Sequence, residues 1–192
     1  MLTRRTFIKS SLATNLAIAA QPGLALGLSQ YAQEDHSLLI FSDETSAQAQ
    51  QFAGQLNTPH SNIEKDVGLH FDTFNRFHRE QPTGWITGLT RDSDFFILEQ
   101  MAATKGYRTV FSAIHETNNN TVTHQVSSSV DKAHLIADSL AQSLENWPSW
   151  LANNITSLAH HELATAQANS QAGSSTNNEY LVSWLLIPST SA

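Results

Sequence analysis

The chain has 192 residues, a formal net charge of −7 at pH 7 and no cysteine. This length corresponds to one soluble domain rather than two catalytic domains. The lack of cysteine excludes disulfides, thiolate zinc sites, Cys-ligated iron–sulfur clusters and thiol catalysis, and the acidic balance argues against a nucleic-acid binder. The charge is uneven, because residues 1–33 carry three basic groups and no acid, which leaves the other 159 residues with 7 basic and 17 acidic groups.

The basic N-terminus has the layout of a secretory signal. Thr3-Arg4-Arg5-Thr6-Phe7-Ile8-Lys9 precedes a modest apolar stretch, 12–28, that is interrupted by polar residues and by Pro22. A membrane anchor needs about 20 predominantly apolar residues, and this stretch is shorter. The segment resembles the twin-arginine translocation (Tat) signal, Ser/Thr-Arg-Arg-x-Phe-Leu-Lys, from which only Ile8 departs. The matching signal residues include Arg4, Arg5, Phe7 and Lys9.

The Tat resemblance implies a location and a kind of partner. Proteins with this signal fold in the bacterial cytoplasm and are exported to the periplasm by the Tat translocase. Many carry a cofactor or travel with a protein that carries one, so a co-exported redox protein is a candidate partner, while no cofactor is assigned to this chain. Cleavage after Ala25 or Gly27 suits a small-x-small site and leaves no membrane span. We therefore expect a signal peptide over 1–27, a polar spacer over 28–37 and one domain over 38–192.

The first half of that domain alternates strands and helices. The apolar run Leu38-Leu39-Ile40-Phe41 predicts a buried strand. Ser93 is a credible N-cap for the helix 93–105, which Gly106 closes before an alternating strand begins. The predicted elements are a strand at 38–41, a helix at 45–56, a strand at 62–64, a helix at 69–79, a loop at 85–91, a helix at 93–105 and a strand at 107–115.

The second half begins with a hairpin. Asn118-Asn119-Asn120 is turn chemistry, and the segment 121–126 alternates between polar and apolar residues. Ser129 is placed to cap the next helix. The remaining predicted elements are a helix at 130–145, a corner at 147–150, a helix at 151–167, a flexible connection at 169–178 and a strand at 180–187. The whole order predicts a single α/β domain with a mixed, mainly parallel sheet flanked by helices.

Polar residues follow the ends of the predicted strands. In open α/β sheets, ligands bind beyond the carboxyl ends of the strands, so these residues are expected to line one crevice with Trp85. There His115 would exchange a proton or ligate a metal, and Asp43 or Glu116 would orient it. The alternative is that these residues only start helices and turns or are solvated. The candidate ligand-binding residues are Asp43, Glu44, Trp85, Thr90, Arg91, His115 and Glu116.

Known catalytic and metal motifs are missing from the sequence. Zinc proteases use His-Glu-x-x-His, but the fourth position after His115-Glu116 is Asn119, and after His161-Glu162 it is Thr165. His160 and His161 are adjacent, so on a helix they would point about 100° apart. There is no nucleophile elbow, phosphate loop or dinucleotide fingerprint. No metal and no catalytic residue is therefore assigned.

One further resemblance concerns the middle of the chain. The segment from Thr83 through Gly88-Leu89-Thr90 and 95–100 to His115 is similar to a group of small, uncharacterised proteobacterial Tat-signal proteins, which offers no activity to transfer. The Tat-like signal, together with the missing motifs, favours a non-enzymatic periplasmic protein, an accessory subunit or binding partner of a cofactor-bearing oxidoreductase. The alternative function is a small-ligand or metal-binding protein, or a modest hydrolase, that uses Asp43, Arg91 and His115.

Overall fold

The computed structural model of this protein describes residues 36–56, 58, 60–63, 66–118, 121–159, 164–171 and 178–189. The chain divides into residues 1–30 and 31–192, and every described residue belongs to the second part. The predicted signal peptide and most of the predicted spacer therefore lie outside the described residues. Among the helices that are described, none has the length and apolar character needed to cross a membrane.

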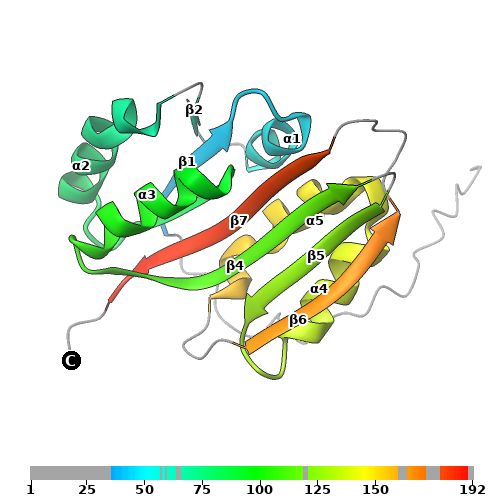
Figure 1. Cartoon of the computed structure of the whole chain (residues 1–192). Helices are drawn as coiled ribbons and strands as arrows, with labels where there is room; N and C mark the ends of the chain where they lie inside the picture. The colour runs from blue at the N-terminus through cyan, green and yellow to red at the C-terminus, as the bar shows by residue number, and fades with distance from the viewer. Residues whose placement is uncertain are drawn as a thin grey trace, which may run out of the picture. The chain divides into compact units, whose positions relative to one another are not determined.

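The described strands form one seven-stranded sheet (Figure 1), in the order β2-β1-β3-β7-β4-β5-β6. The neighbours β2 and β1, and β1 and β3, are parallel, whereas the other four neighbouring pairs are antiparallel. The strands are β1 (Leu38–Asp43), β2 (His60–Ile63), β3 (Trp85–Thr90), β4 (Tyr107–Asn118), β5 (Thr121–Ser128), β6 (Ala164–Gln171) and β7 (Glu179–Pro188).

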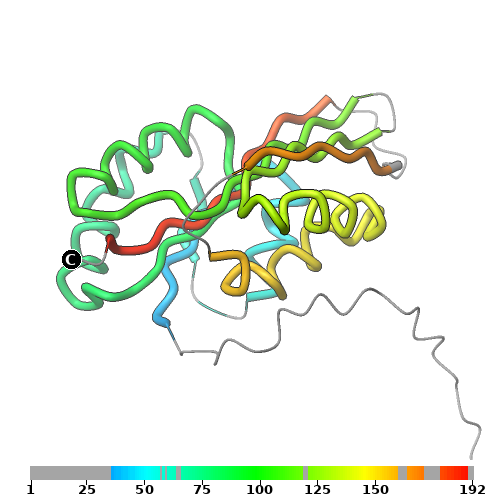
Figure 2. The backbone as a smooth tube through the Cα atoms, turned by 90° about the horizontal axis from the view of Figure 1, so that it is seen from below, coloured from blue at the N-terminus to red at the C-terminus, as the bar shows by residue number. Residues whose placement is uncertain are grey.

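Helices pack on both faces of this sheet. On one face, α1, α4 and α5 cover a core that includes Phe52, Phe111 and Leu140, and on the other, α2 and α3 cover a core around Phe74 and Trp184. Figure 2 shows α4 and α5 on the opposite side of the strands from α3. The helices are α1 (Ala47–Gln55), α2 (Phe71–Glu80), α3 (Asp92–Ala103), α4 (Ala133–Gln142) and α5 (Trp147–Asn154), with short 3₁₀ turns at η1 (Val67–His70), η2 (Leu144–Asn146) and η3 (Ile155–Leu158).

The α/β class is confirmed, but the expectation of a mainly parallel sheet is wrong. Two segments cause the difference. The predicted loop 85–91 contains strand β3. The predicted helix 151–167 is helical only as far as η3, and its last residues begin strand β6, which also takes in the start of the predicted connection 169–178. Because β7 enters the sheet between β3 and β4 and is antiparallel to both, most neighbouring pairs are antiparallel.

Gly88 explains why β3 looks like a loop in the sequence. The indole of Trp184 on β7 lies close against this position, where a Cβ would stand 2.5 Å from the ring and 2.6 Å from the carbonyl oxygen of Phe41. Trp184 also stacks on Phe95 with ring centroids 5.5 Å apart and donates from Nε1 to Thr90 Oγ1 over 3.1 Å. The glycine thus serves close packing between strands rather than a turn.

Two predicted helix starts are shifted. The helix predicted from Ser93 begins at Asp92, with Arg91 as its N-cap, so its first turn carries Asp92 and Asp94, which the helix dipole favours. The helix predicted from 130 begins at Ala133 after the N-cap Lys132, and the buried Ser129 hydroxyl makes no cap bond.

Candidate functional site

An arginine held between two buried aspartates occupies the carboxyl end of β1 and β3. Arg91 Nε donates to Asp94 Oδ2 over 2.8 Å and lies 3.2 Å from Asp43 Oδ2. The two carboxylate side chains are 3% and 7% exposed, whereas the Arg91 side chain is 42% exposed. Asp43 Oδ1 accepts from the backbone N–H and the hydroxyl of Thr45, at 2.8 and 2.7 Å. Both carboxylate oxygens of Asp43 therefore have polar partners in this buried position.

A third carboxylate stands near this cluster. Glu179 begins β7, and burial raises the pKa of its carboxyl group, an effect that the hydroxyl of Ser46 opposes by hydrogen bonding and the charge of Asp43 reinforces. Ser46 is also the N-cap of α1, where its oxygen accepts from Ala49 N at 3.2 Å. The carboxyl edge of the sheet is thus more acidic than basic.

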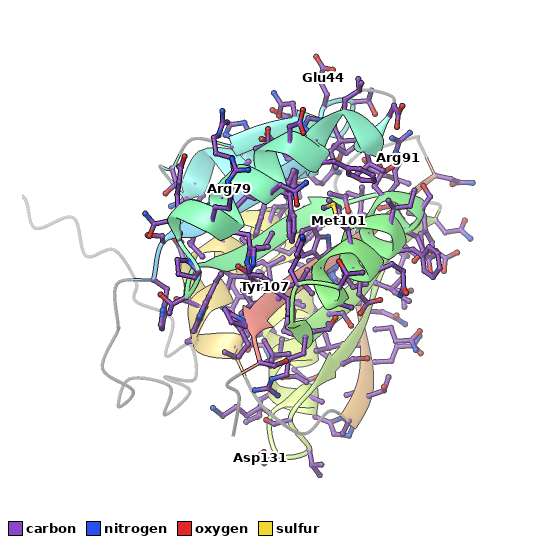
Figure 3. The ribbon with its side chains drawn as sticks, turned by 90° about the vertical axis from the view of Figure 1, so that its left-hand side faces the viewer. Glu44, Arg79, Arg91, Met101, Tyr107 and Asp131 are labelled. Atoms are coloured by element: carbon purple, nitrogen blue, oxygen red, sulfur yellow. The ribbon has the colours of Figure 1, made fainter. Side chains whose placement is uncertain are left out.

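The structure brings together only part of the predicted crevice. Asp43, Thr90 and Arg91 lie at one edge as expected, and Glu44 is beside them but exposed, pointing away from the protein in Figure 3. The placement of Trp85 is wrong, since it pairs with Leu38 at the amino end of the strands and stacks on His36 with ring centroids 4.0 Å apart. A residue that opens a strand lies at the opposite edge from one that follows it.

His115 also departs from the prediction, since it faces the core instead of the edge. It shares its side of β4 with Phe111 and Ala113 and is 1% exposed. Its Nδ1 lies 2.8 Å from Nδ1 of His124 on β5, and its ring stacks on Trp147 with centroids 4.1 Å apart. Glu116, the next residue, takes the other face of the sheet, so it does not orient the imidazole.

The two histidines are the centre of a buried hydrogen-bonded chain across four strands. His115 Nε2 lies 2.8 Å from Ser183 Oγ on β7, and His124 Nε2 lies 2.9 Å from Ser170 Oγ on β6. When one ring donates from Nδ1, the other accepts there, and each serine then accepts from or donates to the remaining nitrogen. Two neutral imidazoles satisfy every ring nitrogen in this way.

Burial keeps these imidazoles uncharged. Burial lowers the pKa of His124 to about 4. It also lowers the pKa of His115 well below the ordinary value, and the proximity of His124 lowers that pKa further. A serine, a histidine and a second orienting group are also the parts of a nucleophilic triad, but here all four side chains are buried. The observed arrangement is a neutral polar link between strands.

Sequence reasoning did not identify His124, Ser170 or Ser183, although one signal was present. His115 and His124 are equally distant from the hairpin turn, so the predicted hairpin already makes them direct cross-strand partners. No comparable sequence signal points to Ser170 and Ser183, because they lie on strands β6 and β7, which are distant in the sequence from the hairpin.

The outer face of the antiparallel half carries a different polar surface. Here Glu116 is directly opposite Tyr180 on β7 and Thr123 on β5, and Thr123 is opposite Asn169 on β6. Tyr180 is 45% exposed. Desolvation raises the pKa of its hydroxyl, and the negative charges of Asp92 and Glu116 raise it further.

We call the outward side chains of β5 and β6, together with Glu116 and Tyr180, the polar face. α4 packs against β5 and β6 from the other side of the sheet, and no described helix covers these strands on the side that faces the viewer in Figure 1. The side chains that β5 and β6 contribute are Thr121, Thr123, Gln125, Ser127, Thr165, Gln167 and Asn169.

Comparisons with protein-family models, curated proteins and solved structures give no match to this chain. Within the described ranges, no group of three or more histidine or carboxylate side chains is arranged to hold a metal ion. The histidine pair that was considered as a metal motif in the sequence lies outside those ranges, as does the glutamate after it (His160, His161 and Glu162).

Proposed function

We propose that this protein is an exported, non-enzymatic binding protein, which leaves the bacterial cytoplasm folded through the Tat pathway and binds a partner protein in the periplasm. A co-exported oxidoreductase is the partner class that the Tat-like N-terminus favours. The observation that carries the binding proposal is the exposed aromatic ring of Tyr180 at the edge of the polar face, opposite Glu116 and within the electrostatic influence of Asp92.

The chemistry of this patch indicates what the partner contributes. An exposed tyrosine offers a ring face to a cation, and the charges of Asp92 and Glu116 make its surroundings negative. Lysine or arginine on the partner therefore fits Tyr180, while its uncharged donors and acceptors fit the hydroxyl and amide groups of β5 and β6. Tyrosine and arginine are enriched among residues that dominate binding energy, and polar interfaces of this kind are typical of non-obligate complexes.

The test is affinity capture from periplasm with the tagged wild-type protein and two variants. Tyr180→Ala and Glu116→Lys are expected to lose the captured partner. Phe71→Ala is the matched control, because Phe71 is an aromatic residue of similar exposure, 41%, on α2. The proposal fails when the wild type retrieves only itself, or when all three variants retrieve the same protein equally.

A small-ligand site at Asp43 and Arg91 is the second candidate function. One observation favours it: Arg91 is fixed through Nε by two buried carboxylates while its side chain stays 42% exposed. With Asp92 beside it, the site suits a zwitterion such as a free amino acid. Thermal stabilisation by glycine or glutamate that disappears in Arg91→Gln supports this function, and no stabilisation of the wild type contradicts it. His115 has no part in it.

A further inference from the structure

Strand β6 ends the sheet without the features that usually protect an edge. It is the last strand in the sheet order, and no described segment pairs with its outer side (Figure 1). Its eight residues, Ala-Thr-Ala-Gln-Ala-Asn-Ser-Gln, include no charge and no proline, and their register with β5 runs unbroken from Ala164 to Gln171. Natural proteins normally block such edges with charges, prolines or bulges because unpaired backbone groups invite another strand.

We propose that β6 pairs antiparallel with β6 of a second copy of this chain, about a two-fold axis through Gln167. Symmetric pairing places each residue opposite its mirror position, so any charge near the axis would face a like charge. The sequence avoids this. Gln167 faces its own copy, and amide groups can donate to and accept from one another. On the other side of the strand, Ala166 meets the partner's Ala168 without steric conflict.

The opposite edge of the sheet, strand β2, is less suited to pairing with a second copy. Strand β2 has only four residues, His60–Ile63, whereas β6 has eight. A longer strand provides more backbone hydrogen bonds for the second copy. The asymmetry between the two edges predicts a closed dimer rather than an extended chain of molecules, because two-fold pairing uses β6 on both copies and leaves no second equivalent edge.

A leucine beside β6 supports the presence of a neighbour. Leu144 begins η2, which packs against β6, and it has a φ of 49° directly after the C-cap of α4. Glycine is the usual residue at this position because a side chain is strained there. Leu144 is nevertheless 52% exposed, so a residue with a strained backbone presents an apolar side chain at the surface of a turn that contacts β6. A second copy that covers it would remove this apolar surface from water.

The dimer would also enlarge the surface proposed for partner binding. A two-fold axis perpendicular to the sheet keeps the polar faces of both copies on the same side, and β6 with its symmetry mate joins them into one surface. The self-association does not rest on the proposed function, because β6 pairs through its backbone whether or not a partner binds at Tyr180. The two proposals therefore fail separately.

Sedimentation equilibrium of the protein purified in its native form from its host measures the mass of the particle in solution. We expect a dimer for the wild type and a dissociation constant at least about tenfold higher for Gln167→Lys, in which like charges face each other. Gln125→Lys is the matched control, since Gln125 is directly opposite Gln167 on the interior strand β5 and is also exposed. It should stay dimeric.

Cysteine substitution gives a second measurement, which is valid even if a lysine at position 167 prevents the protein from folding. The chain has no cysteine, so Gln167→Cys introduces a single thiol. Directly opposed residues of an antiparallel pair lie within disulfide range. Mild oxidation should link Gln167→Cys into a covalent dimer and leave Gln125→Cys monomeric on a denaturing gel. A monomeric wild type, equal cross-linking of both variants, or a different protein bound at β6 would overturn the proposal.

Discussion

Acid should destabilise this protein through the buried histidine pair. The pKa of His124 is lowered to about 4 by burial, and that of His115 is lowered well below its ordinary value. In the unfolded chain a histidine titrates near 6.5. The unfolded state therefore binds protons that the folded state rejects, so the pair's stabilisation is complete above about pH 6.5 and is lost as the pH falls toward 4.

The size of the effect follows from the two pKa values of His124. Between pH 7 and pH 5 an unfolded pKa of 6.5 and a folded pKa of about 4 remove about 2 kcal/mol from the free energy of unfolding. His115 adds to that loss. The geometry explains why a second proton is worse than the first: with both rings charged, two N–H groups would face each other across the 2.8 Å between the Nδ1 atoms.

Urea unfolding at pH 7, 6 and 5 measures this dependence, with tryptophan fluorescence as the signal. The double variant His115→Gln, His124→Gln removes both imidazoles and should lose most of the decline in unfolding free energy. His134→Gln, on the exposed surface of α4, is the control and should keep it. The reasoning is refuted if the double variant declines as steeply as the wild type, or if the control flattens the profile to the same extent.

Two further variants test the packing and the arginine cluster. Gly88→Ala should lower the free energy of unfolding by about 1–3 kcal/mol, since its Cβ would stand 2.5 Å from Trp184. Gly54→Ala, in a helix with nothing within 4 Å of the new Cβ, should instead raise the free energy of unfolding by up to about 1 kcal/mol. Urea unfolding measures both variants, and equal changes in their free energies of unfolding would contradict the close contact between Gly88 and Trp184. Arg91→Gln should cost about 1–2 kcal/mol at pH 7 because Asp43 and Asp94 stay buried without their cation, and an unchanged midpoint would show that Arg91 does not stabilise them.

The part of the fold that follows from local pattern was predictable. The apolar run at β1, the helix α3 that precedes the turn at Gly106 and β4, and the hairpin of β4 and β5 all appear near their expected residues. β3 and β6 were missed because their evidence is not local. Gly88 suits a strand only because an indole from β7 covers it, and the alanines and amides of β6 form a strand only because β5 pairs with them.

The candidate site was likewise predictable in part, where local sequence pattern decides it, and not where the pairing of distant strands decides it. The rule that polar residues gather at the carboxyl ends of strands correctly placed Asp43 near Arg91. It says which end of a strand a residue occupies, but it does not say which face. His115 shares its face with buried residues of β4, and Glu116 takes the other, so strand parity separates two neighbours that the rule had grouped. Tyr180 gained significance only when β4 placed Glu116 opposite it.

The proposed binding function is tested most directly by a photo-cross-linking residue in place of Tyr180, used in living cells of the host. We predict one cross-linked product of defined mass that contains a second, different protein and disappears when Glu116→Lys is introduced. The same group in place of Phe71, a comparably exposed aromatic on α2, should give no such product. The binding account is contradicted if position 180 yields no adduct with another protein, or if its adduct survives the charge reversal at Glu116.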